Sequence, residues 1–176
     1  MNWYALFVPT GKEETVQKFL RLHFDEHSLY SLVPKRRVPE KRAGVVHHVL
    51  RNIFPGYVLI RTNMNSETFH KMNSIPVCFQ LVNNGTYYSK EEGVHYSIIR
   101  DEEMTPILQL IGEGDTVDYS GIYIRNSKVF VKSGPLQGME GIIKRVDPHK
   151  NRAKILLNFM GTEKTIDVGI EVLSKT

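Results

Sequence analysis

The sequence has a single cysteine, Cys78, among its 176 residues. One cysteine excludes an intramolecular disulfide and any zinc site that needs several cysteines. Its apolar neighbours Val77 and Phe79 indicate that Cys78 packs as a small hydrophobic side chain. No apolar run approaches the ~18 residues of a membrane-spanning helix, and the N-terminus has neither the basic nor the apolar segment of a secretion signal. We therefore expect a cytoplasmic protein without a membrane partner.

Catalytic signatures are also missing. The sequence has no H-E-x-x-H, G-x-S-x-G, Walker A or G-x-G-x-x-G pattern, and its seven histidines and nineteen carboxylates show no ligand or acid–base spacing. The adjacent His47 and His48 would point to opposite faces of a strand, which argues against a shared metal ion. We predict no enzyme activity, no catalytic residue, no metal and no cofactor, with a site assembled only in the fold as the open alternative.

The positive charge is unevenly distributed along the chain. The net charge is +4, and residues 128–176 alone carry nine Lys or Arg against five Asp or Glu. Residues 1–111 have an excess of two positive charges, whereas residues 112–127 have an excess of two negative ones. A small basic module is typical of a nucleic-acid or ribosome binder, although many ordinary domains have a similar excess.

Residues 53–60 (Ile-Phe-Pro-Gly-Tyr-Val-Leu-Ile) form an apolar stretch that predicts a buried strand. Pro55 cannot donate a ladder hydrogen bond and Gly56 fits a bend, so both should lie at the start of the strand or at a bulge. Beyond the bend, Tyr57 and Leu59 share one face. That face is either a second part of the core, which the pattern alone favours, or an apolar surface for a partner.

The remaining pattern up to residue 111 predicts strands alternating with helices. Thr10 and Glu13 form an apparent capping box for the first helix, and Asn65 is the expected cap of the second. Pro106 either kinks the third helix or lies in its first turn. The expected strands are 3–8, 29–38, 53–60 and 77–82, and the third helix lies between residues 100 and 111. This order predicts a mixed sheet with helices packed on it.

The chain changes character after residue 111. Residues 112–127 are acidic and contain glycines, so we place a linker there, between an N-terminal domain at 1–111 and a C-terminal domain at 128–176. The C-terminal domain should contain five short strands and form a small SH3-type barrel. The expected strands are 129–132, 141–146, 153–159, 163–166 and 171–173.

A basic segment, residues 35–42, lies in an expected exposed hairpin, because its two prolines disfavour a helix. Its charge either keeps the hairpin soluble or contacts phosphates of a nucleic acid. The sequence alone leaves both alternatives open.

Several segments, in their order along the chain, resemble the NusG family of transcription elongation factors. They are residues 3–6 (Trp-Tyr-Ala-Leu), 54–58 (Phe-Pro-Gly-Tyr-Val), 75–76 (Ile-Pro) and 131–141, which resemble the family's KOW motif. Within the family, residues 10–14, 32–36, 134–141 and 166–173 are most similar to the LoaP-type specialised antiterminators. Housekeeping members usually carry Phe-Ser-Gln where this chain has Val-Gly-Ile at 168–170.

The resemblance implies an α+β protein, with a NusG-like N-terminal α/β sandwich (a mixed sheet with flanking helices) and a C-terminal SH3-like five-stranded KOW β-barrel. It also implies that the N-terminal domain binds the clamp helices of the largest subunit of RNA polymerase. The matching positions are Tyr4, Ala5, Phe54, Pro55, Tyr57 and Leu59. A second polymerase contact matches Thr68, His70 and Lys71. A protein that bridges both sides would keep the clamp closed and suppress pausing and termination.

The resemblance further implies a partner for the barrel. Phe159 aligns with an aromatic residue that contacts a ribosomal protein or termination factor in relatives, or it simply closes the barrel. LoaP-type relatives are recruited by a hairpin in the nascent RNA, which is read mainly through shape and phosphates. Basic side chains crowd one hairpin of the expected barrel, and we assign the nucleic-acid surface to them together with the first cluster. These residues are Lys35, Arg36, Arg37, Lys41, Arg42, Lys144, Arg145, His149, Lys150, Arg152 and Lys154.

The sequence therefore favours a monomeric, specialised transcription factor for processive antitermination, recruited by an RNA hairpin. One alternative is a general NusG elongation factor that couples polymerase to the ribosome or to a termination factor. Another is a ribosome-associated protein, since KOW barrels also occur there.

Overall fold

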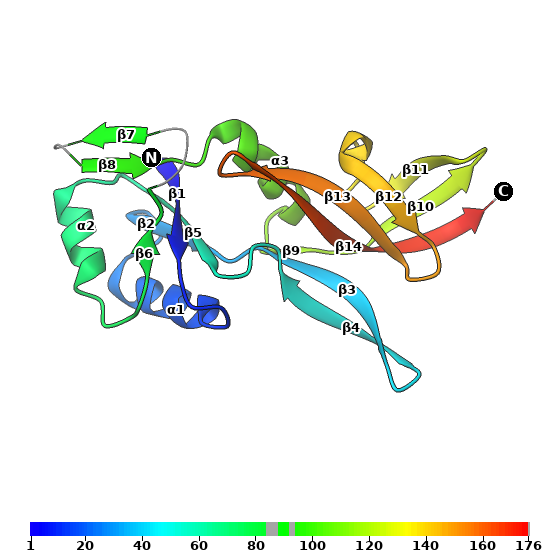
Figure 1. Cartoon of the computed structure of the whole chain (residues 1–176), viewed down its shortest axis with the longest axis horizontal. Coiled ribbons are helices and arrows are strands. Elements are labelled where there is room, and N and C mark those ends of the chain that lie inside the picture. Colours follow the sequence, from blue (N-terminus) through cyan, green and yellow to red (C-terminus); the bar gives the residue numbers. More distant parts are fainter. Residues whose placement is uncertain (84–87, 92–93, 176) are drawn as a thin grey trace. The chain divides into compact units, whose positions relative to one another are not determined.

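The structure, a computed structural model, describes residues 1–83, 88–91 and 94–175 (Figure 1). Contacts divide the chain into two compact units. Unit 1 contains residues 1–33, 54–104 and 159–161, and unit 2 contains residues 34–53, 105–158 and 162–176. The α+β fold class is confirmed, whereas the domain boundaries at 1–111 and 128–176 stay a prediction, because compact units do not report where an independently folding domain begins.

Unit 1 is built on a four-stranded sheet with the strand order β2-β5-β1-β6. All of its recorded pairings are antiparallel, so the sheet is not mixed in the part that the structure describes. Its strands are β1 (Asn2–Phe7), β2 (Leu29–Leu32), β5 (Tyr57–Thr62) and β6 (Gln80–Leu81). The strand predicted at 29–38 ends early, because Pro34 lacks an N–H group and restricts the residue before it. The strand predicted at 77–82 shrinks to the two residues of β6. The packing predicted for Cys78 is wrong, since its side chain is exposed.

Helices α1 (Glu13–His23) and α2 (Ser66–Asn73) belong to unit 1. The predicted cap of α2 is confirmed, since the Asn65 side chain accepts the backbone N–H of Thr68 at 2.8 Å. Val16 and Leu20 of α1 join Val58 and Ile60 of β5 in the hydrophobic core. One face of the strand predicted at 53–60 therefore enters the core, as expected.

A short hairpin and a third helix complete the part of the chain before residue 112. The hairpin consists of β7 (Tyr88–Glu91) and β8 (Val94–Ser97), where the sequence predicted no strand. Helix α3 (Asp101–Ile111) begins five residues before Pro106, so the proline lies inside the helix and not in its first turn. No helix in the described ranges is long and apolar enough to cross a membrane.

Unit 2 contains a curled five-stranded sheet with the order β11-β10-β14-β13-β12, which confirms the expected barrel. The strands are β10 (Ser120–Arg125), β11 (Lys128–Ser133), β12 (Ile143–Asp147), β13 (Arg152–Phe159) and β14 (Thr162–Lys175), with a short 3₁₀ turn at Glu140–Ile142. Two predicted strands, 163–166 and 171–173, are one strand, β14. The fifth strand is β10, which the sequence placed in the linker.

Gly169 explains why β14 continues where the sequence suggested a break. A Cβ atom at Gly169 would lie 1.7 Å from the ring of Tyr119 and 2.7 Å from the carbonyl oxygen of Arg37. The glycine therefore permits a close approach of the strand to its neighbours and does not mark a turn.

The hairpin predicted to contain the basic segment 35–42 is confirmed. Strands β3 (Lys35–Arg42) and β4 (Val45–Asn52) form a long two-stranded ribbon (Figure 1), and β9 (Thr116–Val117) pairs with β3 in parallel. The turn residues Ala43 and Gly44 both have positive φ, 49° and 79°, which is typical of a tight hairpin turn. The hairpin and β9 both belong to unit 2.

The capping box predicted at Thr10 is wrong. Helix α1 begins after Lys12, whose side chain makes no capping bond. The carboxylate of Glu13 instead accepts the backbone N–H of Gly11 at 2.8 Å and that of Gly56 at 2.7 Å. Gly56 has a φ of +85°, so a buried carboxylate fixes the bend that precedes β5.

Replacing Glu13 by Ala would remove the acceptor of both N–H groups. We expect the free energy of unfolding to fall by about 2–3 kcal/mol, because a buried donor without a partner costs about 1–3 kcal/mol. Chemical denaturation followed by circular dichroism measures the change. The exposed Glu26 provides the control, and Glu26→Ala should change the free energy by less than about 0.5 kcal/mol. Equal losses in the two variants would contradict this role of Glu13.

Candidate protein and nucleic-acid interfaces

The residues predicted to contact polymerase come from β1, from β5 and from the bend before β5. Strand register pairs Ala5 with Leu59 and Phe7 with Tyr57, and paired residues lie on the same face of a sheet. Ala5 and Leu59 are fully buried, whereas Tyr4 lies on the opposite face, in the core. The structure therefore places these three predicted residues beneath the surface.

The accessible part of this region is aromatic. Pro55 is exposed, Tyr57 is half-buried and Phe7 is 52% exposed. The rings of Phe7 and Tyr57 meet edge to face with centroids 5.6 Å apart. Beside them lies a hollow of about 270 Å³ that is lined by both rings and by residues 80–83. The sequence analysis missed Phe7, although its two-residue spacing from Ala5 places it on this face.

Phe54 is covered by another aromatic ring. Its ring stacks on that of Phe159, with centroids 4.1 Å apart and planes at 15°, and only 4% of Phe54 is exposed. Tyr57 meets the same Phe159 ring edge-on at 5.3 Å. Phe54 and Phe159, which were predicted to contact different partner proteins, thus contact each other within unit 1.

The turn that carries Phe159 is held by a carboxylate. Met160 and Gly161 both have positive φ, 53° and 77°. Their backbone N–H groups donate to the carboxylate of Glu103, at 2.8 and 3.0 Å. Because the turn is fixed at its backbone, the Phe159 ring keeps its position over Phe54.

The second predicted contact lies on α2. His70 and Lys71 are exposed and Thr68 is half-buried. The ammonium group of Lys71 lies 4.5 Å from the centre of the Phe24 ring, a cation–π contact. The helix presents these side chains, and their role in binding polymerase stays a prediction.

The predicted nucleic-acid residues fall into two groups. In the first group the side chains are half-buried and form hydrogen bonds or ion pairs within unit 2. Arg36 donates to the carbonyl oxygen of Asp167 at 2.7 Å, and Arg37 lies 3.4 Å from the carboxylate of Asp118. Burial lowers the pKa of the Arg36 guanidinium. Lys35 likewise forms an ion pair with Asp115 at 3.4 Å. These side chains hold the hairpin in place.

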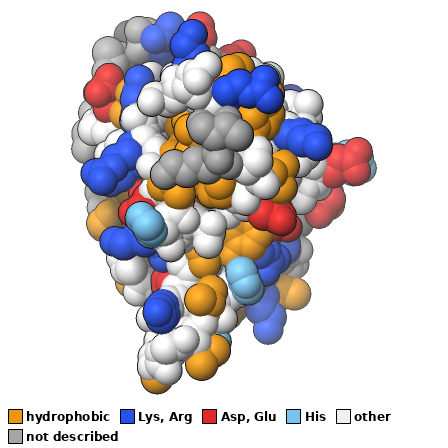
Figure 2. Space-filling view, turned by 90° about the vertical axis from the view of Figure 1, so that its right-hand side faces the viewer, with side chains coloured by type: hydrophobic (Ala, Val, Ile, Leu, Met, Phe, Trp, Pro, Cys, Tyr) orange, Lys and Arg blue, Asp and Glu red, His pale blue; other side chains and the backbone are white. Residues whose placement is uncertain are grey.

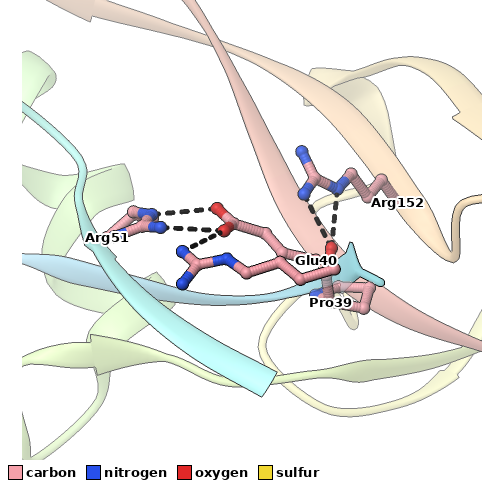
Figure 3. Close-up of polar contacts among 5 residues, drawn as sticks. Pro39, Glu40, Arg51 and Arg152 are labelled. Carbon is pink, nitrogen blue, oxygen red and sulfur yellow. Dashed lines mark hydrogen bonds and ion pairs between the residues drawn. The ribbon is translucent and has the colours of Figure 1, made fainter. Parts of the chain in front are cut away.

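Arg152 belongs to the same group. Its guanidinium donates to the carbonyl oxygen of Pro39 at 2.6 and 3.2 Å (Figure 3) and lies 3.7 Å from the carboxylate of Asp167. Strand β3 is therefore attached to β13 through an arginine and a main-chain oxygen.

The second group is exposed to solvent. Within the part of the chain that the structure describes, five members make no ion pair or side-chain hydrogen bond: Lys41, Lys144, Arg145, His149 and Lys150. Arg42 and Lys154 are exposed as well, although each lies near a carboxylate. Figure 2 shows Lys and Arg side chains at several separate places on one face, interrupted by hydrophobic and acidic side chains. Local geometry therefore decides which cations can act together.

Glu40 organises the arginines of the hairpin. Arg51 donates two hydrogen bonds to its carboxylate, at 2.8 and 2.9 Å, and Arg42 donates a third at 3.2 Å (Figure 3). These bonds, chiefly those from Arg51, lower the pKa of the Glu40 carboxyl from 4.5 to about 2. The described residues contain no group of three or more His, Cys, Asp or Glu side chains that could hold a metal ion.

Comparison with known proteins supports the resemblance. The family model described as transcription termination factor NusG matches residues 1–108, and the KOW motif matches residues 125–155. The chain is 27% identical over 180 residues to the transcription termination/antitermination protein NusG of Escherichia coli strain K12, which covers 99% of this chain and 96% of that protein. It is 28% identical over 173 residues to the protein of the same name in Vibrio parahaemolyticus, covering 95% and 91% of the two chains.

A solved structure, described as domain interaction in Thermotoga maritima NusG, shares the fold with a TM-score of 0.53. The two chains are 21% identical, and the match covers 96% of this chain and 93% of the other. The predicted NusG family and KOW motif are confirmed, whereas the similarity to LoaP-type paralogues stays a prediction.

The Glu40 carboxyl should titrate near pH 2 in a pH series followed by carboxyl ¹³C NMR, and Arg51→Ala should return its pKa towards 4.5. Because the pKa is depressed in the folded state, the stabilisation from this carboxylate is present above about pH 4.5 and is lost as the pH falls to about 2. Arg42→Ala, which removes the longer bond, is the control and should shift the pKa less. A wild-type Glu40 that titrates near 4.5 would contradict the assignment.

Proposed function

Because this chain belongs to the NusG family of transcription termination and antitermination factors, we propose that it is a specialised member that binds RNA polymerase. It suppresses pausing and termination processively, and a hairpin in the nascent transcript recruits it. The observation that carries the polymerase contact is the surface formed by Phe7, Pro55 and Tyr57, beside a hollow that both aromatic rings line. A groove of this kind accepts the apolar face of a helix, and the clamp helices are the proposed partner.

The proposed action needs no bond to be made or broken. A factor that binds the closed clamp more tightly than the open clamp shifts the equilibrium towards the closed form. The aromatic surface holds one side of the clamp. On the other side the proposed contact is α2, through the half-buried Thr68 and the exposed His70 and Lys71. Polymerase held closed on nucleic acid enters pauses less often.

The stacked pair Phe54 and Phe159 adds a condition to this binding. A clamp helix that packs on Phe54 has to displace the Phe159 ring, since that ring already covers it. The apparent affinity for polymerase is then reduced by the fraction of molecules in which the ring has moved away. A partner that binds through Phe159, as the sequence predicted, also requires the two stacked rings to separate.

Recruitment by RNA is supported by the five exposed side chains of unit 2 that make no ion pair within the described residues, Lys41, Lys144, Arg145, His149 and Lys150. They supply the salt-dependent affinity that phosphates require. A general NusG-type elongation factor is the alternative, and the similarity to curated NusG proteins along almost the whole chain favours it equally.

Two variants should change polymerase binding in opposite directions. Tyr57→Ala should weaken binding by about tenfold or more, because buried aromatic anchors dominate such interfaces. Phe159→Ala should strengthen binding by about two- to tenfold, because a stacked aromatic pair contributes about 0.5–1.5 kcal/mol. Titration of labelled full-length protein with core RNA polymerase measures both.

The exposed Phe130, which stacks on Tyr123, gives the control variant Phe130→Ala. Melting curves identify variants that lose affinity by misfolding. Glu103→Ala frees the turn without removing the ring and should also strengthen binding. If Tyr57→Ala binds as well as the wild type, the aromatic surface is not the polymerase site.

The specialised role is tested by readthrough of an intrinsic terminator in single-round transcription. Templates that carry different structured leader sequences upstream should respond differently, with readthrough rising on a few of them. Uniform readthrough on all templates, including one without a structured leader, would favour the general elongation factor. Polymerase alone provides the baseline for every template.

A further inference from the structure

Two hollows adjoin on the surface of unit 2. The first, of about 540 Å³, is lined by residues 39–42 and Val46 of the β3–β4 hairpin and by residues 149–152. The second, of about 190 Å³, extends along β12 and β13 and shares Lys150 and Arg152 with the first. The shared walls make one groove, and its two sides come from segments far apart in the sequence.

Cations dominate the walls of this groove. Six Lys or Arg side chains and His149 line it, against three carboxylates. The six are Lys41, Arg42, Arg145, Lys150, Arg152 and Lys154. The lining of the groove therefore has a net positive charge.

Each of the three carboxylates already has partners within the unit. Glu40 accepts hydrogen bonds from two arginines, as described above. Asp147 accepts the backbone N–H groups of His149 and Lys150, both at 3.1 Å, and so shapes the β12–β13 turn. Asp167 lies 3.7 Å from Arg152 and 4.0 Å from Lys154. The carboxylates therefore stabilise the walls of the groove through contacts within unit 2. Lys41, Arg145 and Lys150 make no such contact with the described residues and are available to an anionic ligand.

The lining also indicates which kind of anion fits. No Phe, Tyr or Trp side chain is among the residues that line either hollow. A third hollow shares part of the lining of the first and includes Tyr119, but that ring is half-buried, packs against Gly169 and meets the ring of His48 edge to face. Proteins that bind unpaired strands stack bases on aromatic rings, whereas paired RNA is recognised through its shape, phosphates and 2′-hydroxyl groups. A basic groove whose own lining has no aromatic ring on which a base could stack fits a paired backbone.

We propose that this groove binds the phosphate backbone of a paired RNA segment. Lys41 contacts it from the hairpin side, and Arg145 and Lys150 from the barrel side. Arg152 is a positioning residue, because its bonds to Pro39 set the distance between the two walls. The inference rests on the proposed recruitment by a nascent RNA hairpin and names the site of that recruitment.

The test compares two double variants of the full-length protein that remove equal charge. Lys41→Ala with Lys150→Ala removes one phosphate contact from each wall. Lys132→Ala with Lys164→Ala removes two exposed lysines that line neither hollow and were not assigned to the nucleic-acid surface. Each is titrated at several salt concentrations with a fluorescent RNA hairpin, a DNA hairpin of the same sequence and an unpaired RNA of the same length.

For the groove variant we expect a several-fold weaker affinity for the RNA hairpin. The slope of log affinity against log salt should fall in magnitude by about two, because each lost phosphate contact lowers it by about one. Each single variant should lower it by about one, since the two lysines act from different walls. The control variant should leave the slope almost unchanged.

Other results would overturn the inference. If the groove variant binds the hairpin as the control does, the groove is not the site, while recruitment by RNA stands. Equal or tighter binding of the DNA hairpin or of the unpaired RNA by the wild-type protein would refute the choice of paired RNA. If the wild-type protein binds no RNA, both this inference and RNA recruitment fail, whereas the polymerase contact through Tyr57 is unaffected.

Discussion

Two arginines that donate to main-chain carbonyl oxygens hold unit 2 together. Arg36 reaches from β3 to the carbonyl of Asp167, and Arg152 reaches from β13 to the carbonyl of Pro39. Each connects the hairpin with the five-stranded sheet, in opposite directions along the sequence. Arginine suits this task because its planar group presents several donors at once. Together with the pairing with β9 and the ion pairs of Lys35 and Arg37, these bonds fix the position of the hairpin and the separation of the walls of the groove.

These bonds also explain why basic residues close together in the sequence have different roles. Arg36 and Lys41 lie on the same strand, yet one is half-buried and bonded while the other is exposed. The same division separates Arg152 from Lys150. A cation that is bonded to other groups of the unit contributes to the stability of the unit. An exposed cation without such a partner can form an ion pair with a ligand. Positive charge alone therefore overstates the size of a nucleic-acid surface.

The sequence predicted correctly those elements whose structure depends on a local pattern of residues. The hairpin, the barrel and a strand after the bend at Pro55 and Gly56 follow from alternation, prolines and turn residues, and the structure contains all three. Strand β5 begins at Tyr57, however, and not at residue 53. The sequence did not predict elements whose structure depends on residues far away in the chain. Strand β10 is apolar for only three residues, 122–124, and it becomes part of the sheet by pairing with β11 and β14. Glu13 was wrongly assigned to a helix cap, because the local pattern cannot show its bond to Gly56, which lies 43 positions further along the chain. Likewise, no local pattern indicates that Phe159 stacks on Phe54.

The stack of Phe54 and Phe159 has a thermodynamic consequence. The two rings cover each other, so a ligand that takes hold of one ring leaves the other uncovered. Any ligand of Phe159 and any ligand of Phe54 are then linked, and each raises the affinity of the protein for the other by the same factor. Two partners that never touch would thereby bind cooperatively, and the strength of their cooperation would equal the free energy of one aromatic contact.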